Sequence, residues 1–182
     1  MRALLRLSFV ILLLAAVTGC ATRNVVSDGE DSNLMLRGND PVAYQTEGKA
    51  VKGNPALKAV HDGLTYRFAS ESNRRLFLSS PARYVPAYAG YCASGVHYGL
   101  KAAIGAETFK VVDGRLYLFG GPRSRRNWEL HQADNIRNGD AMWEEIKDRP
   151  YRLQNLYRYT FKVPGYKTDA ELDAEWARRQ GK

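Results

Sequence analysis

The stretch Val60–Phe68 reads VHDGLTYRF, and Val111–Phe119, which starts 51 residues later, reads VVDGRLYLF. In both stretches an Asp-Gly pair stands between strand-forming residues, and Asp-Gly favours the left-handed dihedral angles of a type I′ turn. The aromatic residues after each turn are two positions apart, so they share one face of a strand. Each stretch therefore predicts a tight β-hairpin.

The similarity extends past the hairpins, because Arg74–Phe77 reads RRLF and Arg125–Trp128 reads RRNW at the same spacing. A hairpin followed by a helix, present twice, is typical of an internal duplication. Asp-Gly hairpins are also common in unrelated proteins, so two independent hairpins would explain the same pattern. The sequence leaves both interpretations open.

Local signals predict two short helices near these hairpins. Ser70 or Ser72 can cap the first. This helix has to end before Pro81, because proline disfavours helical geometry in the residue that precedes it. Asp140 can cap the second helix, which ends before Pro150. Helices that alternate with hairpins in this way indicate an α+β fold.

The size and composition of the chain agree with one small α+β domain. The chain has 182 residues, of which 45% are hydrophobic, and only 2 of its residues are cysteines. A chain of this size and composition can bury a hydrophobic core. Its length excludes a large multidomain enzyme, and its cysteine content excludes a scaffold built from disulfides. We place the folded domain at residues 35–148 and a C-terminal extension at residues 149–182.

The C-terminal extension carries two further signals. Tyr157–Val163 alternates aromatic or aliphatic residues with polar or basic ones, which predicts a two-faced β-strand. Thr168–Glu171 matches a capping box and predicts a helix that runs to about Arg178. The aromatic residues either pack back on the domain or present an aromatic, basic surface to a partner protein or to lipid head groups. They are Tyr157, Tyr159, Phe161 and Trp176.

Residues 1–19 have the parts of a bacterial signal peptide. Arg2 and Arg6 flank the start of the apolar run Phe9–Val17, which is too short to cross a bilayer as a helix. Val17–Cys20 reads VTGC and resembles the lipobox, in which the chain is cut before the cysteine and the cysteine carries acyl chains such as palmitate. An ordinary secretory signal that happens to contain a cysteine is the alternative.

The residues after the cleavage point indicate where the protein lies. Ala21 rather than Asp follows Cys20, which by the same resemblance favours the periplasmic face of the outer membrane in the bacterial cell envelope. Residues 20–34 are mostly polar and predict a flexible tether. Loss of Arg2 and Arg6 changes the net charge from +8 to +6 (8 − 2 = 6). A basic exported protein meets anionic lipid and cell wall, so we expect the membrane as a partner and no nucleic acid.

A series of motifs, in order along the domain, resembles the YHS domain family and, within it, the exported members. They are Gly38–Tyr44 (GNDPVAY), Tyr66–Phe68 (YRF), Asn73–Phe77 (NRRLF), Pro81–Pro86 (PARYVP), Gly90–Ala93 (GYCA) and Asp113–Leu118 (DGRLYL). The family is regarded as a metal-associated module that is found beside transport proteins for copper and other heavy metals. The resemblance therefore implies that the protein handles a heavy metal, with a copper ion as the leading candidate, and it implies no known activity.

One departure from that family bears on the metal ligands. In its metal-transporter members the first hairpin ends in a Phe-Cys-Ser-x-x-Cys arrangement, whereas Phe68–Asn73 reads FASESN. Both thiols are missing, so a site for a soft metal has to use other ligands. The candidates are Cys92, His97, His61, His131 and Met35.

Cys92 and His97 are the closest pair of candidates in the sequence. A spacing of five puts them on opposite faces of a strand and about 140° apart on a helix, so a bend at Gly95 is needed to bring them together. Cysteine is also among the residue types that are most often buried, and Cys92 as a small core hydrophobe is the alternative. In that case the chain is a structural or interaction lipoprotein without a metal.

The sequence predicts a binding role and not an enzyme. Cys92 as a nucleophile with His97 as its base would need supporting groups, but the second glycine of a nucleophile elbow is absent and no orienting acid is indicated. Gly120–Pro122 has neither the spacing nor the lysine of a phosphate-binding loop. We therefore expect no catalytic residues.

Overall fold

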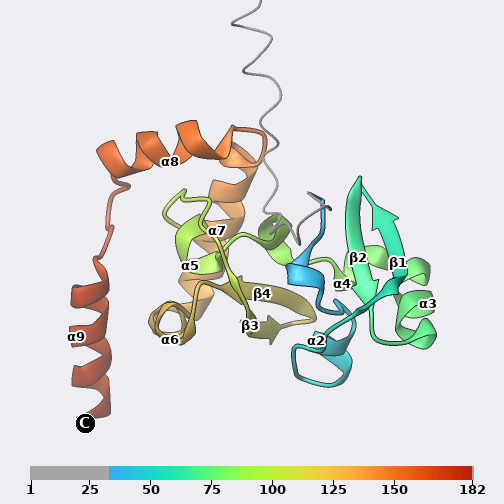
Figure 1. The fold of residues 1–182 in the computed structure, drawn as a ribbon. Coiled ribbons are helices and arrows are strands. Elements are labelled where there is room, and N and C mark those ends of the chain that lie inside the picture. Colours follow the sequence, from blue (N-terminus) through green and yellow to red (C-terminus); the bar gives the residue numbers. More distant parts are fainter. Residues whose placement is uncertain (1–32, 182) are drawn as a thin grey trace, which may run out of the picture.

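A computed structural model describes residues 33–181, and its helices and two small antiparallel sheets confirm the α+β class. Each sheet is one hairpin (Figure 1): β1 (Asn54–His61) pairs with β2 (Leu64–Phe68), and β3 (Gly105–Val112) pairs with β4 (Arg115–Phe119). The Asp-Gly pairs form the turns, and both residues of each pair have positive φ, as a type I′ turn requires. Both predicted hairpins are confirmed.

The two hairpins share one register. Every paired position of the first has its counterpart 51 residues later in the second, beginning with Asn54 opposite Phe68 and Gly105 opposite Phe119. Each hairpin also carries an irregularity directly after this first pair, where the pairing shifts. A slip of one residue would turn every side chain to the other face, so the shared register keeps the corresponding aromatic residues, Tyr66 with Tyr117 and Phe68 with Phe119, on the buried face.

Each hairpin is followed by a helix that packs an aromatic ring on it. α3 (Glu71–Ser79) begins after Ser70, whose hydroxyl accepts a backbone N–H, so the predicted cap is confirmed. α6 (Pro122–Glu129) begins 51 residues after α3. The ring of Phe77 lies 4.8 and 5.2 Å from the two aromatic rings of β2, and the ring of Trp128 lies 5.4 and 5.2 Å from those of β4. The same ββα unit is therefore present twice.

A left-handed turn and a short helix precede each hairpin. The turns are η1 (Leu36–Gly38) and η2 (Ala87–Gly90), and each contains consecutive residues with positive φ. The short helices are α2 (Ala43–Thr46) and α5 (Ala93–Val96). α4 (Pro81–Tyr84) joins the first unit to the second. The buried side chains of both units form one hydrophobic core.

Asp40 ties the segments of the first unit together. Its side chain is fully buried between η1 and α2. Oδ1 accepts the backbone N–H of Val42 at 2.8 Å, while Oδ2 accepts the backbone N–H of Ala69 at 2.8 Å and the side-chain amide of Asn73 at 2.7 Å. One carboxylate thus joins the start of α2, the end of β2 and the first turn of α3, and bonds to an ionised acceptor are the strong ones.

α7 (Gln132–Ile146) is longer than the sequence predicted and follows His131. Asp140 lies within it, so the prediction that this residue caps a short helix is wrong. Its carboxylate accepts two bonds from the guanidinium of Arg115, at 2.8 and 2.9 Å, and one from the hydroxyl of Tyr88 at 3.0 Å. The hydrogen-bond partners of this carboxylate lie on β4 and η2. They are far from Asp140 in the sequence, so local sequence signals do not predict them.

The described part of the extension, residues 149–181, contains two helices and no strand. α8 (Tyr151–Thr160) begins after Pro150, so the strand predicted at Tyr157–Val163 is wrong. Neither sheet includes this segment, and its polar residues at helical spacing bond to the domain instead. α9 (Asp169–Gln180) opens with the predicted capping box at Thr168.

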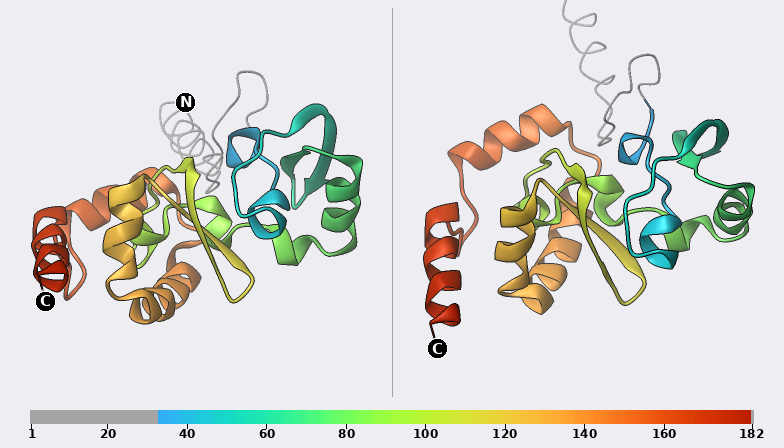
Figure 2. Two further views of the ribbon diagram at one scale, coloured as in Figure 1. Left: turned by 90° about the horizontal axis from the view of Figure 1, so that it is seen from below. Right: turned by 60° about the horizontal axis from the view of Figure 1, so that its bottom comes forward.

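Figure 2 shows α9 at one end of the molecule and the first ββα unit at the other, with the second unit between them. Leu34, which the sequence assigned to the tether, is fully buried and pairs with Thr65, so the ordered domain begins earlier than expected. The proposed signal peptide, Cys20 and the tether up to residue 32 lie outside the described residues. No helix within residues 33–181 has the length and apolar character needed to span a membrane.

Replacement of Asp40 by Asn should destabilise the fold by about 2 to 3 kcal/mol. Asn replaces one carboxylate oxygen by an NH2 group, which cannot accept the N–H groups that this oxygen now accepts. The measurement is the free energy of unfolding in urea. Asp113→Asn makes the same chemical change at an exposed turn and should alter stability by less than about 0.5 kcal/mol. Equal losses in the two variants would contradict the role given to Asp40.

Candidate functional site

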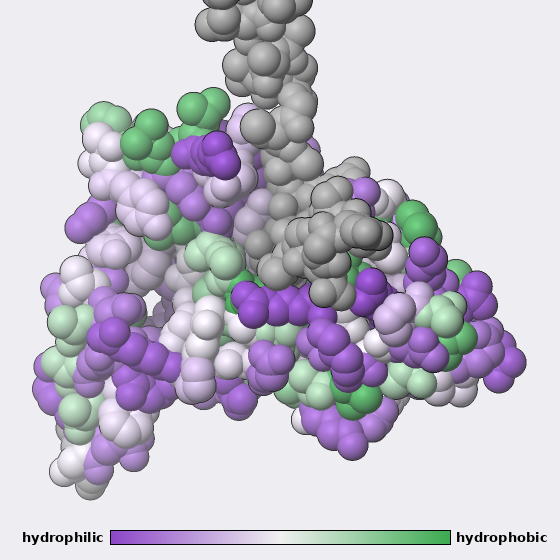
Figure 3. All heavy atoms as spheres, viewed as in Figure 1, coloured by the Kyte–Doolittle hydropathy of each residue, from purple (hydrophilic) through white to green (hydrophobic). Residues whose placement is uncertain are grey.

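A cleft of about 850 Å³ opens between the second unit and the C-terminal extension. α5, α6 and α7 provide one wall, and residues 163–172, which lead into α9, provide the other. Figure 3 shows a gap in the surface between α9 and the rest of the molecule at this place. Three of the five ligands considered from the sequence, Cys92, His97 and His131, line this cleft.

Cys92 lies at the head of α5, and only 3% of its surface is exposed. Its Sγ lies 3.2 Å from the hydroxyl of Ser94 and 3.3 Å from that of Ser124, and it accepts the backbone N–H of Gly120 at 3.3 Å. The two hydroxyls also bond to each other. Cys92 is therefore buried, as the core interpretation expects, but its sulfur has three polar partners, which a simple core hydrophobe lacks.

The partners of Cys92 repeat those of Asp40 in the first unit. Gly120 and Ser124 stand 51 positions after the two residues whose nitrogens donate to Asp40 Oδ2. Asp40 and Cys92 each follow a left-handed turn and precede a short helix. Cys92 thus occupies the position of a buried acceptor, at which the first unit has a carboxylate.

His97 lies at the end of α5, and Nδ1–H donates to the carbonyl of Ala93 at 3.3 Å. Burial lowers the pKa of His97 to about 4, so its imidazole is neutral at pH 7 and the lone pair is on Nε2. Gly95 lies inside this one-turn helix, and Cys92 and His97 flank its two ends. A Cβ at Gly95 would lie 3.0 Å from the carbonyl oxygen of Leu100, so the turn has little room for a side chain there.

His131 already has a partner on the opposite wall. Its Nε2 lies 2.7 Å from a carboxylate oxygen of Glu175, and the other oxygen accepts from the ammonium of Lys167 at 2.7 Å. The bond from Lys167 and the nearby imidazole hold the pKa of Glu175 at about 2. The ring nitrogen of His131 that faces α9 is therefore engaged in this contact.

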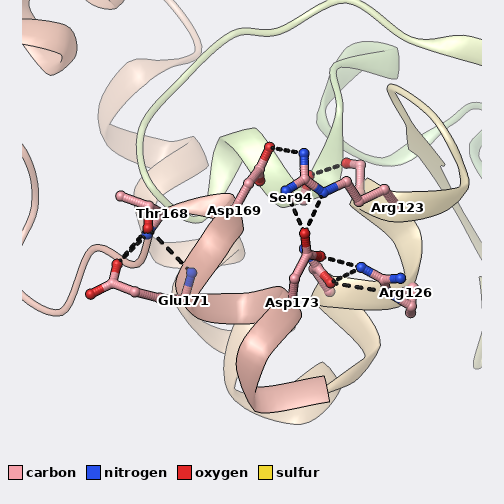
Figure 4. Close-up of polar contacts among 9 residues, drawn as sticks. Ser94, Arg123, Arg126, Thr168, Asp169, Glu171 and Asp173 are labelled. Atoms are coloured by element: carbon pink, nitrogen blue, oxygen red, sulfur yellow. Dashed lines mark hydrogen bonds and ion pairs between the residues drawn. The ribbon is translucent and has the colours of Figure 1, made fainter. Parts of the chain in front are cut away.

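Ion pairs fix α9 against α6 (Figure 4). Asp173 lies between two guanidinium groups, accepting from Arg123 at 2.9 Å and also from Arg126. Asp169 lies 3.3 Å from Arg123. The guanidinium of Arg126 also sits over the ring of Trp176, 4.6 Å from its centroid. The outer wall of the cleft thus depends on partly exposed charges, which salt screens.

Two sequence candidates lie away from this cleft. His61 is at the end of β1, with its ring edge-on to Phe77 at 6.0 Å, and Met35 is buried in the core beside the first hairpin. Neither residue lines the cleft beside Cys92. Met142 of α7 does line the cleft, although the sequence analysis did not single it out. Only its residue type marks it in the sequence, and that is a weak signal because a methionine on a long helix is more often a core residue.

Within residues 33–181, no three side chains of the His, Cys, Asp and Glu types lie close enough together to hold a metal ion. The cleft instead gathers sulfur and imidazole donors around its walls. Thiol, thioether and imidazole groups suit soft ions such as Cu(I) better than hard ions such as Mg²⁺.

Comparisons with known proteins do not indicate a function for this chain. No protein-family model, no curated protein and no solved structure matches the chain. The resemblance to the YHS domain family therefore rests on the motifs quoted from the sequence.

The buried imidazole of His97 should make the fold sensitive to acid. Its pKa is about 4 in the folded state and about 6.5 in the unfolded chain, so its contribution is complete above pH 6.5 and is lost as the pH falls towards 4. His97→Gln should remove about 2 to 3 kcal/mol of the stability change between these pH values, measured by urea unfolding. His61→Gln, at the tip of β1, serves as the control. An unchanged acid dependence in His97→Gln would contradict this role.

Proposed function

We propose that this chain is a lipid-anchored protein of the bacterial cell envelope whose second ββα unit binds a soft metal ion, with Cu(I) as the leading candidate. One observation carries the metal proposal: Cys92, His97, His131 and Met142 line a single cleft although they are spread along two helices and a turn. Of these, Cys92 and His97 are the ligands we assign. The function proposed is binding, without catalysis.

The chemistry of the two ligands supports this assignment. The imidazole of His97 is neutral at pH 7 and directs Nδ1–H to a backbone carbonyl, an arrangement that fixes the ring and leaves Nε2 for a metal. The sulfur of Cys92 is a soft donor that lines the same cleft. The motifs that resemble the YHS domain family, with its association with copper transport proteins, point to the same class of ion.

A second candidate function has an observation of its own. Cys92 is nearly fully buried and stands where the first unit uses Asp40 as a structural acceptor. In that case Cys92 joins the hairpin to α6, and the protein is a structural or interaction lipoprotein that binds no metal. The two functions differ in what Cys92→Ser does to metal affinity.

Titration of the non-acylated chain with Cu(I) against a competing chelator tests the proposal. Cys92→Ser and His97→Ala should each weaken binding by about tenfold or more, because each removes a soft or imidazole ligand. His61→Ala, the same substitution outside the cleft, should leave the affinity unchanged. Urea unfolding of each variant checks that it remains folded. Cu(I) affinity that is unaffected by both cleft substitutions would exclude this site and favour the structural role of Cys92.

Lipid anchoring is tested separately by Cys20→Ser in the full-length chain. Serine offers no thiol for acylation, so metabolic labelling with a palmitate analogue should disappear and the lipoprotein route of signal removal should stop. Cys92→Ser should be labelled like the parent. Equal labelling of Cys20→Ser and the parent would contradict the lipobox assignment.

A further inference from the structure

α8 is an amphipathic helix that packs its polar face on the domain and exposes its apolar face. Its polar residues face the domain: Gln154 is 2% exposed and donates to the carbonyl of Gly99 at 2.8 Å. Asn155 accepts the backbone N–H of Lys101 at 2.8 Å and donates to its carbonyl at 3.0 Å. Arg158, one helical turn further on, packs over Gly99. Hydrogen bonds, not apolar packing, hold this helix in place.

The apolar side chains of the same segment face outward. Six of the nine large hydrophobic side chains that are exposed in residues 33–181 lie between Tyr151 and Phe161. Leu156 is 64% exposed, Tyr159 70% and Phe161 61%. Figure 3 shows green, hydrophobic side chains over α8 at the top of the molecule, with pale and purple residues between them. Such a concentration on one helix marks an interaction surface, whereas scattered exposed hydrophobic residues need no explanation.

The charge along this segment of the chain has one sign. From Arg149 to Thr168 the sequence contains five Lys or Arg residues and no Asp or Glu. Arg152 and Lys162 are exposed beside the apolar side chains. Leucine, phenylalanine and tyrosine with flanking cations form the composition of a helix that lies in the headgroup region of an anionic bilayer, where the tyrosine hydroxyl stays hydrated.

The position of the N-terminal end of the described residues agrees with a membrane at this surface. The first described residues and α8 lie on the same upper side of the molecule in Figure 1 and in the right-hand view of Figure 2. Cys20 stands fourteen positions before Leu34. Even fully extended, a segment of that length spans at most roughly 50 Å, so an acylated Cys20 would keep α8 within reach of the bilayer.

We infer that residues 151–162, with the exposed apolar face of α8 and its flanking cations, dock on the anionic phospholipid surface of the membrane. The inference rests on the proposed function only in placing the protein at a membrane, and it does not depend on metal binding. Docking would orient the domain and leave the Cys92 cleft, which lies beyond α8 towards α9, in the aqueous phase.

The test is sedimentation with vesicles of phosphatidylethanolamine and anionic phosphatidylglycerol. The chain from residue 21 onward keeps every described residue and carries no acyl group, so binding in this assay is independent of lipidation and of copper. We expect it to sediment with these vesicles, to release as salt rises, and to bind poorly to vesicles without phosphatidylglycerol.

Two matched triple variants locate the surface. Leu156→Ser/Tyr159→Ser/Phe161→Ser should lower vesicle partitioning by about tenfold or more while thermal unfolding stays unchanged, because these side chains are exposed in the fold. The control, Val60→Ser/Leu76→Ser/Leu78→Ser, removes exposed hydrophobic residues from the first unit and should bind like the parent. The double variant Arg152→Gln/Lys162→Gln keeps the apolar side chains and tests the cations alone. It should weaken vesicle binding about fivefold per cation.

Three outcomes would overturn the inference. They are a parent chain that does not bind anionic vesicles, equal losses in the two triple variants, and a parent that forms a dimer which only the α8 variant disrupts. The last outcome would assign the surface to a second copy of this chain. Acylation at Cys20 and Cu(I) affinity are measured separately, so a failure here leaves the proposed function standing.

Discussion

A single buried acceptor at the head of each ββα unit is the interaction on which the structure depends. In the first unit the carboxylate of Asp40 collects N–H groups from the start of α2, the end of β2 and α3. A small two-stranded hairpin is only marginally stable by itself, so it needs a helix held against it. The acceptor ties the end of β2 to the first turn of α3, which Ser70 caps, and the aromatic rings of hairpin and helix pack together in the core.

The second unit keeps this arrangement but changes the acceptor from a carboxylate to the thiol of Cys92. Cysteine sulfur is a weaker hydrogen-bond acceptor than a carboxylate oxygen. The second unit is also the one that is extended by α7, α8 and α9. α7 and the segment that leads into α9 line the cleft. The difference between the two copies is therefore concentrated at one residue and at the walls that were added beside it.

The C-terminal extension has two different kinds of contact with the domain. α9 is attached through carboxylates between arginines, while α8 is attached through side-chain amides that bond to the backbone near Gly99 and Lys101. Because these contacts use the polar residues of α8, its apolar residues remain on the outside. An outward apolar face and a lipid anchor at the other end of the chain would give the domain two points of attachment to one membrane.

The sequence by itself determined both hairpins, the cap at Thr168, a first cap at Ser70 or Ser72, and the repeat spacing of 51 residues, because turns and caps are set by residues that are neighbours in the chain. It placed Asp140 at a helix start and predicted a strand at Tyr157–Val163, where α8 ends, since the partners that decide both lie far away in the chain. Only the tertiary structure decided that Cys92 replaces Asp40, and that His97 but not His61 shares its cleft. Those relations are made by side chains that meet after the two units have packed, and no spacing along the chain encodes them.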